Sequence, residues 1–406
     1  MIYATLILCT ALDFVKKTHT MKPRKLRSIQ VYRTVALVMV YLFHQTLVDE
    51  AWSRLGVCMF FIITGFVTAY RDYDAMSAET MGVRGCIAYG MRRIRPIYLL
   101  HVIMLLVACP AYVYSTWDSF RMDVMRNSVT TAIRFILNLL LISDWIPHIS
   151  ILSTITGEYN IATWFLSACL LFYIVTPPLF RFMHRIWDYD DARVTVRRIL
   201  VSSVVIYALI AISNLTCMTF QDRAYVFWHI YESPLSRIGD YVIGCGLGVM
   251  YRRLCSEREI MPAHDKHRLW RGMTVASAFA TGLMMYAAVK LLPEDMKLIV
   301  SSGFYFTIPV SGLIMGGAMI ESGSRVPDEE HDGLLLRVIL WLAAISPYAY
   351  LIQVPVINLA HGVYKRIDEV NIWIWFVISA IITLLASELY RRMSAERHKH
   401  TAPADR

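Results

Sequence analysis

The chain has 406 residues, of which 57% are hydrophobic and 17% are charged, and its mean hydropathy is +0.48. Soluble domains carry about 25% charged residues, so this composition excludes a soluble protein and indicates an integral membrane protein. The net charge of +9 does not indicate nucleic-acid binding, because the basic residues cluster beside the ends of apolar runs, as they do on the cytosolic side of membrane proteins.

Residues 1–28 form an N-terminal tail in this interpretation. An apolar stretch comes first and Lys16 and Lys17 follow it, which is the wrong order for a secretory signal. Met21 is followed by the basic run KPRKLR, which is typical of the start of a cytosolic tail. We therefore interpret residues 1–20 as an upstream extension.

Apolar runs of about 20 residues recur from residue 29 to residue 390, and each is about long enough to cross a bilayer as a helix. The sequence therefore predicts an all-α bundle of about ten transmembrane helices in one domain, residues 29–390, followed by a basic cytosolic tail, residues 391–406. The predicted spans are 29–48, 54–70, 96–115, 162–180, 199–219, 236–251, 272–291, 298–320, 335–357 and 371–390.

The first predicted span contains two ionisable residues, Arg33 and His44, in the run RTVALVMVYLFH. On a helix they lie within about 20° of one another and roughly 16 Å apart along the axis. Ionisable groups in a span are costly, so they usually face a cavity or the protein interior and indicate a functional site. A histidine satisfied by a neighbouring helix is the structural alternative. We expect Arg33 near the cytosolic entrance and His44 deeper.

Three arginines, Arg92, Arg93 and Arg95, stand directly before the third predicted span. Guanidinium groups bind phosphate in bidentate geometry, so this position suits a polyphosphorylated donor such as acyl-coenzyme A. Ordinary positive-inside flanking explains any one of them equally well. Together with His44, they predict a donor-binding mouth.

Segment 131–147 is apolar but carries Arg134 and Asn138. If it crossed the membrane, the arginine-rich loop 181–198 would lie outside, against the positive-inside bias. If it is re-entrant or interfacial, the basic loops and both termini share one side. We therefore predict ten spans with one re-entrant or interfacial segment, both termini in the cytosol, and the cell (plasma) membrane as the location.

Six segments, in order, resemble the membrane-bound acyltransferase 3 family, whose members move acyl groups onto sugars of cell-surface and secreted glycans. Each segment is permissive by itself, but their order along the chain is moderately specific. The matching segments are RTVALVMVYLFH (33–44), GVCMFFIITGF (56–66), the pair Arg92 and Arg95, TWFLSACLLFY (163–173), SRIGDYVIGCGLG (236–248) and ISPYAYLIQVPVI (345–357).

The chain departs from the family pattern at three places. Cys58 stands where many members carry an acid, the run 168–170 replaces a common acidic pair, and Gln353 occupies a frequent histidine position. These departures leave the histidine without an identified carboxylate partner and indicate a divergent branch.

The resemblance implies O-acyl transfer from cytosolic acyl-coenzyme A, with acetyl-coenzyme A expected, to a hydroxyl of a glycan or glycolipid. Transfer needs a base near neutral pH, and histidine is the side chain with a suitable unperturbed pKa. We therefore predict His44 as the general base. Arg33 would stabilise developing negative charge or hold the donor phosphates together with the arginines before the third span.

Four further residues are predicted to belong to the site, Ser167 as a catalytic residue and the other three for substrate binding. Trp164 and Ser167 share a helix face, where the tryptophan would stack on a sugar and the serine would hold the acceptor, the donor or a relayed acyl group. Glu158 is predicted to orient His44. Tyr173 is a further candidate for substrate contact. Interfacial tryptophans and serines that pack helices together are the structural alternatives.

Arg237 and Asp240 are expected to pair with one another, and Gly244, Gly246 and Gly248 to permit close helix packing.

A transporter or flippase that uses Arg33 and His44 in a proton or anion pathway is the alternative function. The expected partners are the glycan or glycolipid acceptor, acyl-coenzyme A and membrane lipid, and the sequence is compatible with a homo-oligomer. The eight cysteines stand singly, without CxxC spacing or a histidine-rich tract, so no metal cofactor is expected.

Overall fold

The computed structural model describes residues 24–78, 80–115, 121–122, 124–149, 152, 155–187, 191–256, 263–322, 333–364 and 372–401, and in this part of the chain every regular element is a helix. The predicted upstream extension, residues 1–20, lies outside the described residues. The helices are α2 (Arg27–His44), α3 (Glu50–Ala78), α4 (Val83–Ser115), α6 (Val124–Leu139), α7 (Thr163–Trp187), α8 (Ala192–Cys217), α9 (Arg223–Phe227), α10 (Pro234–Ser256), α11 (Ala263–Lys290), α12 (Thr307–Ser322), α13 (Leu334–Tyr364) and α14 (Ile372–Thr401).

The expected all-helical membrane bundle is confirmed in its coarse form. Among the described residues, seven helices are long and apolar enough to cross a membrane: α3, α4, α7, α8, α11, α13 and α14. The other three predicted spans fall on α2, α10 and α12, which are shorter or more polar and pack against the buried helix α3. The count of about ten spans stays a prediction.

Helix α6 occupies most of the segment whose crossing the sequence left in question. It has 16 residues, which is short for a membrane-spanning helix. Asn138 is its one buried residue among those described, so most of the helix surface is left uncovered by the protein. Its assignment as a re-entrant or interfacial segment stays a prediction.

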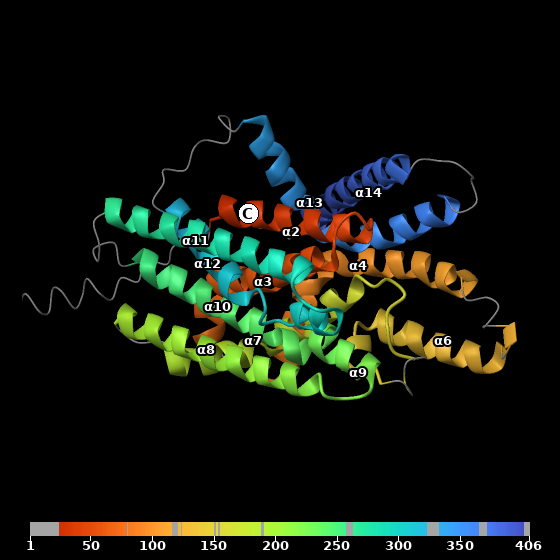
Figure 1. Ribbon diagram of the computed structural model, residues 1–406, viewed down its shortest axis with the longest axis horizontal. Helices are drawn as coiled ribbons and strands as arrows, with labels where there is room; N and C mark the ends of the chain where they lie inside the picture. Colours follow the sequence, from red (N-terminus) through yellow and green to blue (C-terminus); the bar gives the residue numbers. More distant parts are fainter. Residues whose placement is uncertain are drawn as a thin grey trace, which may run out of the picture.

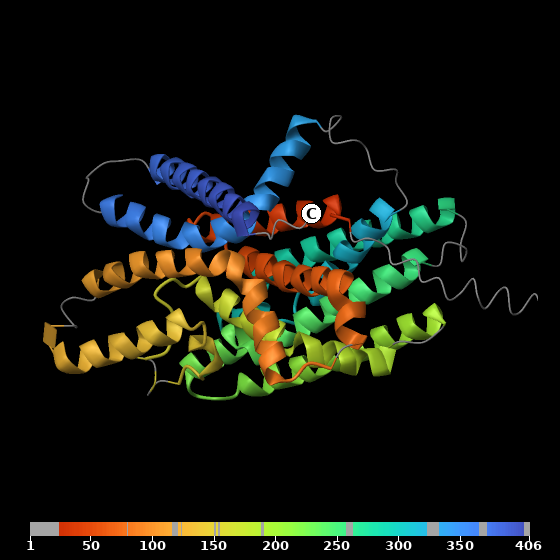
Figure 2. The same ribbon diagram turned by 180° about the vertical axis from the view of Figure 1, so that it is seen from behind.

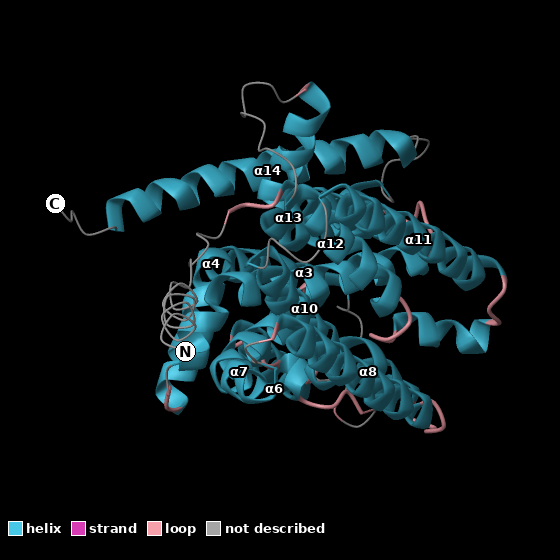
Figure 3. Ribbon diagram, turned by 90° about the vertical axis from the view of Figure 1, so that its left-hand side faces the viewer, coloured by secondary structure: helices cyan, strands magenta, loops and turns pink. Residues whose placement is uncertain are grey.

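Helix α3 lies at the centre of the bundle and is buried along most of its length (Figure 3). Its most extensive contacts are with α10, and glycines set the distance between the two helices. Gly65 of α3 faces the backbone of Tyr241, and Gly244 and Gly248 of α10 face the backbone of α3. Gly246 faces side chains of α7 and α8. The predicted use of these glycines for close packing is confirmed.

A buried ion pair ties α10 to its neighbours, as the sequence predicted. The Arg237 guanidinium lies 3.5 Å from Asp240 Oδ2 and donates to the carbonyl oxygens of Tyr231 and Ser301. Asp240 also accepts a 2.6 Å hydrogen bond from the Thr307 hydroxyl. Buried charges persist only when they are paired and hydrogen-bonded in this way.

Helices α8, α11 and α14 lie at the periphery of the bundle (Figure 3). Many of their apolar side chains are exposed, as expected for faces that contact lipid. Two long helices bend where proline interrupts them. Helix α4 contains Pro96 and changes direction part-way along its length (Figure 2), and α13 contains Pro347 and does the same (Figure 1).

The bundle has two chemically different ends, with α2 running from one to the other. Arg24, Lys25 and Arg71 line a cavity beside the start of α2. This end of α2 lies to the left in Figure 1, and we call it the basic end. His44 and the loop that carries Glu158 lie at the opposite end.

Because α3 and α10 pack so closely, a larger residue at one of their contact glycines should destabilise the protein. Gly244→Ala should lower the free energy of unfolding by about 1–3 kcal/mol, because the new methyl group meets the Ile62 backbone and neither helix can yield cheaply. Gly272→Ala in α11 is the matched control, since the space around Gly272 is open, and it should leave stability unchanged or slightly raised. Thermal unfolding of the detergent-purified proteins measures both. Equal effects of the two substitutions would contradict the packing account.

Candidate active site

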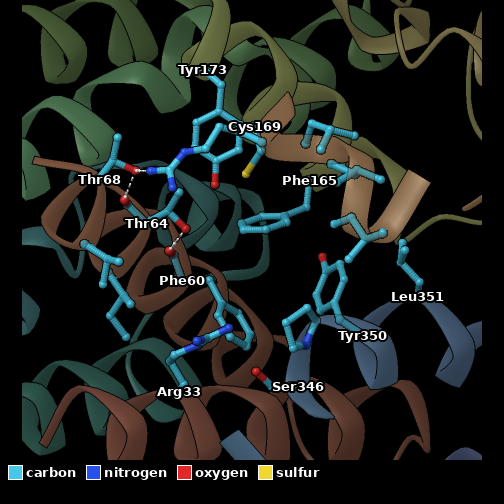
Figure 4. Close-up of a pocket in the computed structure, with 17 residues that line it drawn as sticks. Arg33, Phe60, Thr64, Thr68, Phe165, Cys169, Tyr173, Ser346, Tyr350 and Leu351 are labelled. Carbon is cyan, nitrogen blue, oxygen red and sulfur yellow. Dashed lines mark hydrogen bonds between the residues drawn. The ribbon is translucent and has the colours of Figure 1, made fainter. Parts of the chain in front are cut away.

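Two cavities meet at Arg33. The first, of about 350 Å³, lies at the basic end and is lined by cationic residues that include Arg24, Lys25 and Arg71. We call it the mouth cavity. The second, of about 260 Å³, lies deeper between α2, α3, α4, α7 and α13, and we call it the inner cavity (Figure 4). Arg33 and Val67 line both cavities, so the two cavities adjoin at these side chains.

The Arg33 guanidinium is an uncompensated cation. Within the described part of the chain it has no hydrogen bond and no acidic partner, and the ionisable groups within its electrostatic range are the phenols of Tyr173 and Tyr348. A partly buried cation without a counter-ion is costly. Since it lines two cavities, it is suited to bind an anion that enters from the basic end.

The inner cavity has a second cation and aromatic walls. Arg93 donates to the Thr68 hydroxyl at 3.0 Å, lies 3.2 Å from Asp72 Oδ2, and faces the Tyr173 ring at 5.2 Å. Figure 4 shows Arg33 and Tyr173 on opposite sides, with Phe165 projecting between them. The arrangement accepts a narrow, mainly apolar group with a polar atom near a guanidinium.

The structure separates the three arginines that the sequence grouped. Arg93 lines the inner cavity, whereas Arg92 and Arg95 are exposed and line a different cavity, between α4 and α14. Helix geometry is the reason: at 100° per residue, Arg92 and Arg95 share one face and Arg93 lies on another. Their joint action on the donor stays a prediction, and Arg93 alone is placed beside Arg33.

The positive-inside bias accounted for the cations at the mouth from the sequence alone, because Arg24 and Lys25 precede the first span and Arg71 follows the second. Glu321, at the end of α12, fixes the position of Arg24 and of the start of α2. Its carboxylate accepts hydrogen bonds of 2.8 Å from the backbone N–H groups of Arg27 and Ser28 and from the Ser28 hydroxyl. The Arg24 guanidinium donates to the Glu321 carbonyl at 2.9 Å. Glu321 thus caps α2 and holds the mouth in place.

His44 ends α2 at the opposite end and is partly buried. Its ring lies 5.3 Å from that of Phe43, and it is within electrostatic range of Arg54, which pairs with Glu50 at 3.0 Å. His44 lines neither the mouth cavity nor the inner cavity. Its role as the base stays a prediction.

Trp164 and Ser167 are both buried in the packed interior of α7's first turns. The Trp164 ring lies 4.6 Å from that of Tyr231, and the Ser167 hydroxyl donates to the Leu141 carbonyl at 2.8 Å. Neither residue lines the inner cavity, although Phe165 and Leu166 between them do. These contacts are structural, and roles in acyl transfer or sugar binding stay predictions.

Glu158 belongs to a cluster that the sequence analysis did not identify. It lies close to Asp144 and His148 in the segment between α6 and α7. Burial and the nearby Asp144 carboxylate raise the pKa of Glu158 well above its usual range. Asp144 and His148 lie at the end of an apolar run, ten or more residues before Glu158. No sequence pattern links the three residues, and only the folded segment brings them together.

A family profile described as an acyltransferase domain matches residues 26–391. The chain belongs to the acyltransferase 3 family. Acyltransferase MdmB of Streptomyces mycarofaciens is 22% identical over 318 residues, which cover 76% of this chain and 69% of that protein. No solved structure matches the chain. As a member of the acyltransferase 3 family, the protein is an acyltransferase for groups other than aminoacyl groups, which confirms the resemblance and favours this function over a transporter.

Because Glu321 caps α2, its substitution should lower both the stability of the protein and its affinity for the donor. Glu321→Gln removes one of two accepting oxygens, so the free energy of unfolding should fall by about 1–2 kcal/mol. Stabilisation by coenzyme A should also weaken, because the Glu321 carboxylate fixes the start of α2, which follows Arg24 and carries Arg33. Glu388→Gln, which removes a carboxylate bonded to Arg391 and Arg392, should leave coenzyme A binding unchanged. Thermal unfolding with and without coenzyme A tests both; unchanged donor binding in Glu321→Gln contradicts the role of the cap.

Proposed function

We propose that this acyltransferase takes an acyl group, with acetyl as the expected one, from cytosolic acyl-coenzyme A and transfers it to a hydroxyl of a glycan or glycolipid. The observation that carries the proposal is the uncompensated Arg33 guanidinium where the mouth and inner cavities meet. Coenzyme A pairs a phosphate-rich nucleotide with a narrow, uncharged arm that ends in the thioester. The two cavities match these two halves in charge and width.

In this proposal the donor phosphates bind at the mouth. Arg24, Lys25 and Arg71 supply cations there, and arginine binds phosphate oxygens in pairs. The arm passes Arg33 and Val67 and enters the inner cavity, where Phe165 and Tyr173 form apolar walls. The thioester oxygen then lies within reach of Arg33 or Arg93, and either guanidinium stabilises the negative charge that develops on it during acyl transfer.

The acceptor hydroxyl approaches from the opposite end, where His44 is proposed as the general base. Arg33 and His44 lie roughly 16 Å apart along one helix, so the thioester end of the donor must reach toward His44 along α2. There the acceptor oxygen forms the new ester bond, the C–S bond breaks, and the coenzyme A thiolate leaves with the proton that His44 took from the acceptor hydroxyl. This requires the inner cavity to extend toward that end when both substrates are bound. Ser167, which bonds the Leu141 carbonyl in the turn after α6, and Trp164, which packs against Tyr231, act in this proposal as positioning residues.

The orientation follows from charge. We propose ten spans, with α2, α10 and α12 added to the seven long apolar helices, and α6 as the re-entrant or interfacial segment. The basic end then faces the cytosol with both termini, in the plasma membrane, as the positive-inside bias requires. A donor from the cytosol and an acceptor on the outer side would each reach their own end of the bundle.

If Arg33 binds the donor, removal of its charge should abolish donor binding. Coenzyme A at a hundredfold excess over its Kd should stabilise the wild-type protein by about 2.7 kcal/mol, seen as a higher Tm in detergent. Arg33→Gln should abolish that increase, because no other group among the described residues places a free cation where the cavities meet. Arg223→Gln is the matched control, since Arg223 is an exposed arginine at the start of α9 and lines neither donor cavity, and it should retain the increase. Equal changes of Tm with coenzyme A in the two variants would contradict the assignment of Arg33 as the donor-binding residue.

The assignment of His44 as the general base predicts that its substitution abolishes acyl transfer without lowering the amount of protein in the membrane. Membranes that contain His44→Ala should incorporate at least about 100-fold less label from labelled acetyl-coenzyme A into glycan or glycolipid than wild-type membranes, the range for a general base. Coenzyme A should still raise the Tm of the variant, because His44 does not line the donor cavities. His229→Ala, at the same end and bonded to Ser213, is the control for insertion and abundance. Retained transfer in His44→Ala would exclude it as the base.

A further inference from the structure

A cluster of three potential metal ligands lies at the end of the bundle opposite the basic end. Asp144 follows Ser143 in a single 3₁₀ turn after α6, and His148 and Glu158 belong to the segment that leads into α7. One ligand atom from each residue lies within 4.8 Å of the others. The cluster lies outside the mouth and inner cavities.

Each residue of the cluster has a buried ligand atom without a hydrogen-bond partner: Asp144 Oδ1, His148 Nε2 and Glu158 Oε1. Asp144 is fully buried, with 0% of its surface exposed. An unpaired buried polar atom costs about 1–3 kcal/mol, and more when it is charged. Three residues that each hold such an atom, and whose ligand groups lie within 4.8 Å of one another, are therefore better explained by a shared ligand than by three separate defects.

The imidazole is held with one nitrogen directed away from its protein partner. His148 Nδ1 lies 3.2 Å from Glu232 Oε2, so the carboxylate accepts the Nδ1 proton and leaves Nε2 as a lone-pair donor. Metal-ligating histidines are oriented in this way by a carboxylate on their second nitrogen. Glu232 comes from the helical turn that ends before α10, far from the cluster in sequence.

A cation would relieve the repulsion between the two carboxyl groups of the cluster when both are ionised. Asp144 and Glu158 place two carboxyl groups side by side, and among the described residues neither carboxyl group has a basic partner other than His148. Arg134 is close, but it donates to the carbonyl oxygens of Gly157 and Glu158. Arg54 forms an ion pair with Glu50 and stacks on Tyr231, so it does not pair with the carboxyl groups of the cluster.

We propose that Asp144, His148 and Glu158 bind a divalent transition-metal ion of the Zn²⁺ or Mn²⁺ type, with Glu232 orienting the histidine. One imidazole and two carboxylates suit these ions better than Ca²⁺ or Mg²⁺, which prefer oxygen ligands only. Ligand atoms about 2.1 Å from such an ion lie roughly 3–4 Å apart. Small side-chain rotations bring the present cluster to that spacing.

The ion would fasten the segment before α7 to the rest of the bundle. The Asp144 carbonyl already accepts a 2.9 Å hydrogen bond from Trp228 Nε1, and the next residue, Trp145, donates to the Ser167 carbonyl at 3.2 Å. Glu158 is within electrostatic range of Tyr350, which lines the inner cavity. The metal therefore stabilises the structure at the outer side of the inner cavity, and its binding does not depend on the proposed donor or base.

The test is metal binding by the full-length, untagged protein in detergent. After removal of metals with a chelator, the protein is incubated with ZnCl₂ or MnCl₂, desalted, and analysed for bound metal and thermal unfolding. We expect about one equivalent of one of these metals and an increase in Tm, which MgCl₂ and CaCl₂ should not produce. Asp144→Asn and His148→Gln should lose the bound metal, and Glu232→Gln should weaken binding by about 10–100-fold.

Asp222→Asn is the matched control. It makes the same carboxyl-to-amide change at the same end, at a helix cap outside the cluster, and should retain the metal. Binding of less than a tenth of an equivalent by the wild-type protein overturns the proposal without reference to any variant, and leaves a shared proton as the explanation of the carboxyl pair. Stoichiometric metal in Asp144→Asn and His148→Gln also overturns it, because the ion would then bind elsewhere.

Discussion

The interior of the bundle is organised around a cation that the protein itself does not neutralise. Arg33 lies between apolar helices, and among the described residues it has no acidic partner. A charge in this position persists only if a cavity gives it access to water or to an anion. The two cavities that meet at Arg33 supply that access, and the cations of Arg24 and Arg71 set the sign of what enters. In the proposed function, an anionic donor neutralises this charge.

Close packing between helices holds Arg33 in position. The backbones of α3 and α10 approach closely at Gly65 and Gly244, which leaves α3 rigid at the centre of the bundle and α2 packed against it. Glu321 caps α2 from the end of α12, so the mouth is fixed by a contact between the first and a late helix of the domain. At the other end, Asp144 and Glu158 gather the segment before α7. The two ends thus differ in charge and in the means by which they are fastened.

Much of the architecture could be predicted from the sequence because lipid imposes a simple rule on composition. Runs of about 20 apolar residues must be helices, and each of the ten predicted spans falls on a helix. The pairing of Arg237 with Asp240 and the close packing at Gly244 were also predictable, since both depend on residue type and local spacing. The order of motifs was enough to recognise the acyltransferase 3 family. The grouping of Arg92, Arg93 and Arg95 could not be settled from adjacency in sequence, because a helix sends neighbouring residues to different faces.

The sequence by itself therefore determined that this is a helical membrane protein with an ionisable pair in its first span, because composition and periodicity are properties of the chain alone. Only the tertiary structure decided which charges share a cavity. It placed Arg93 beside Arg33, left Arg95 outside, brought Arg24 to the mouth, and assembled Asp144, His148 and Glu158 with Glu232. Contacts between residues far apart in sequence depend on how helices pack and where they bend, and no local pattern encodes them.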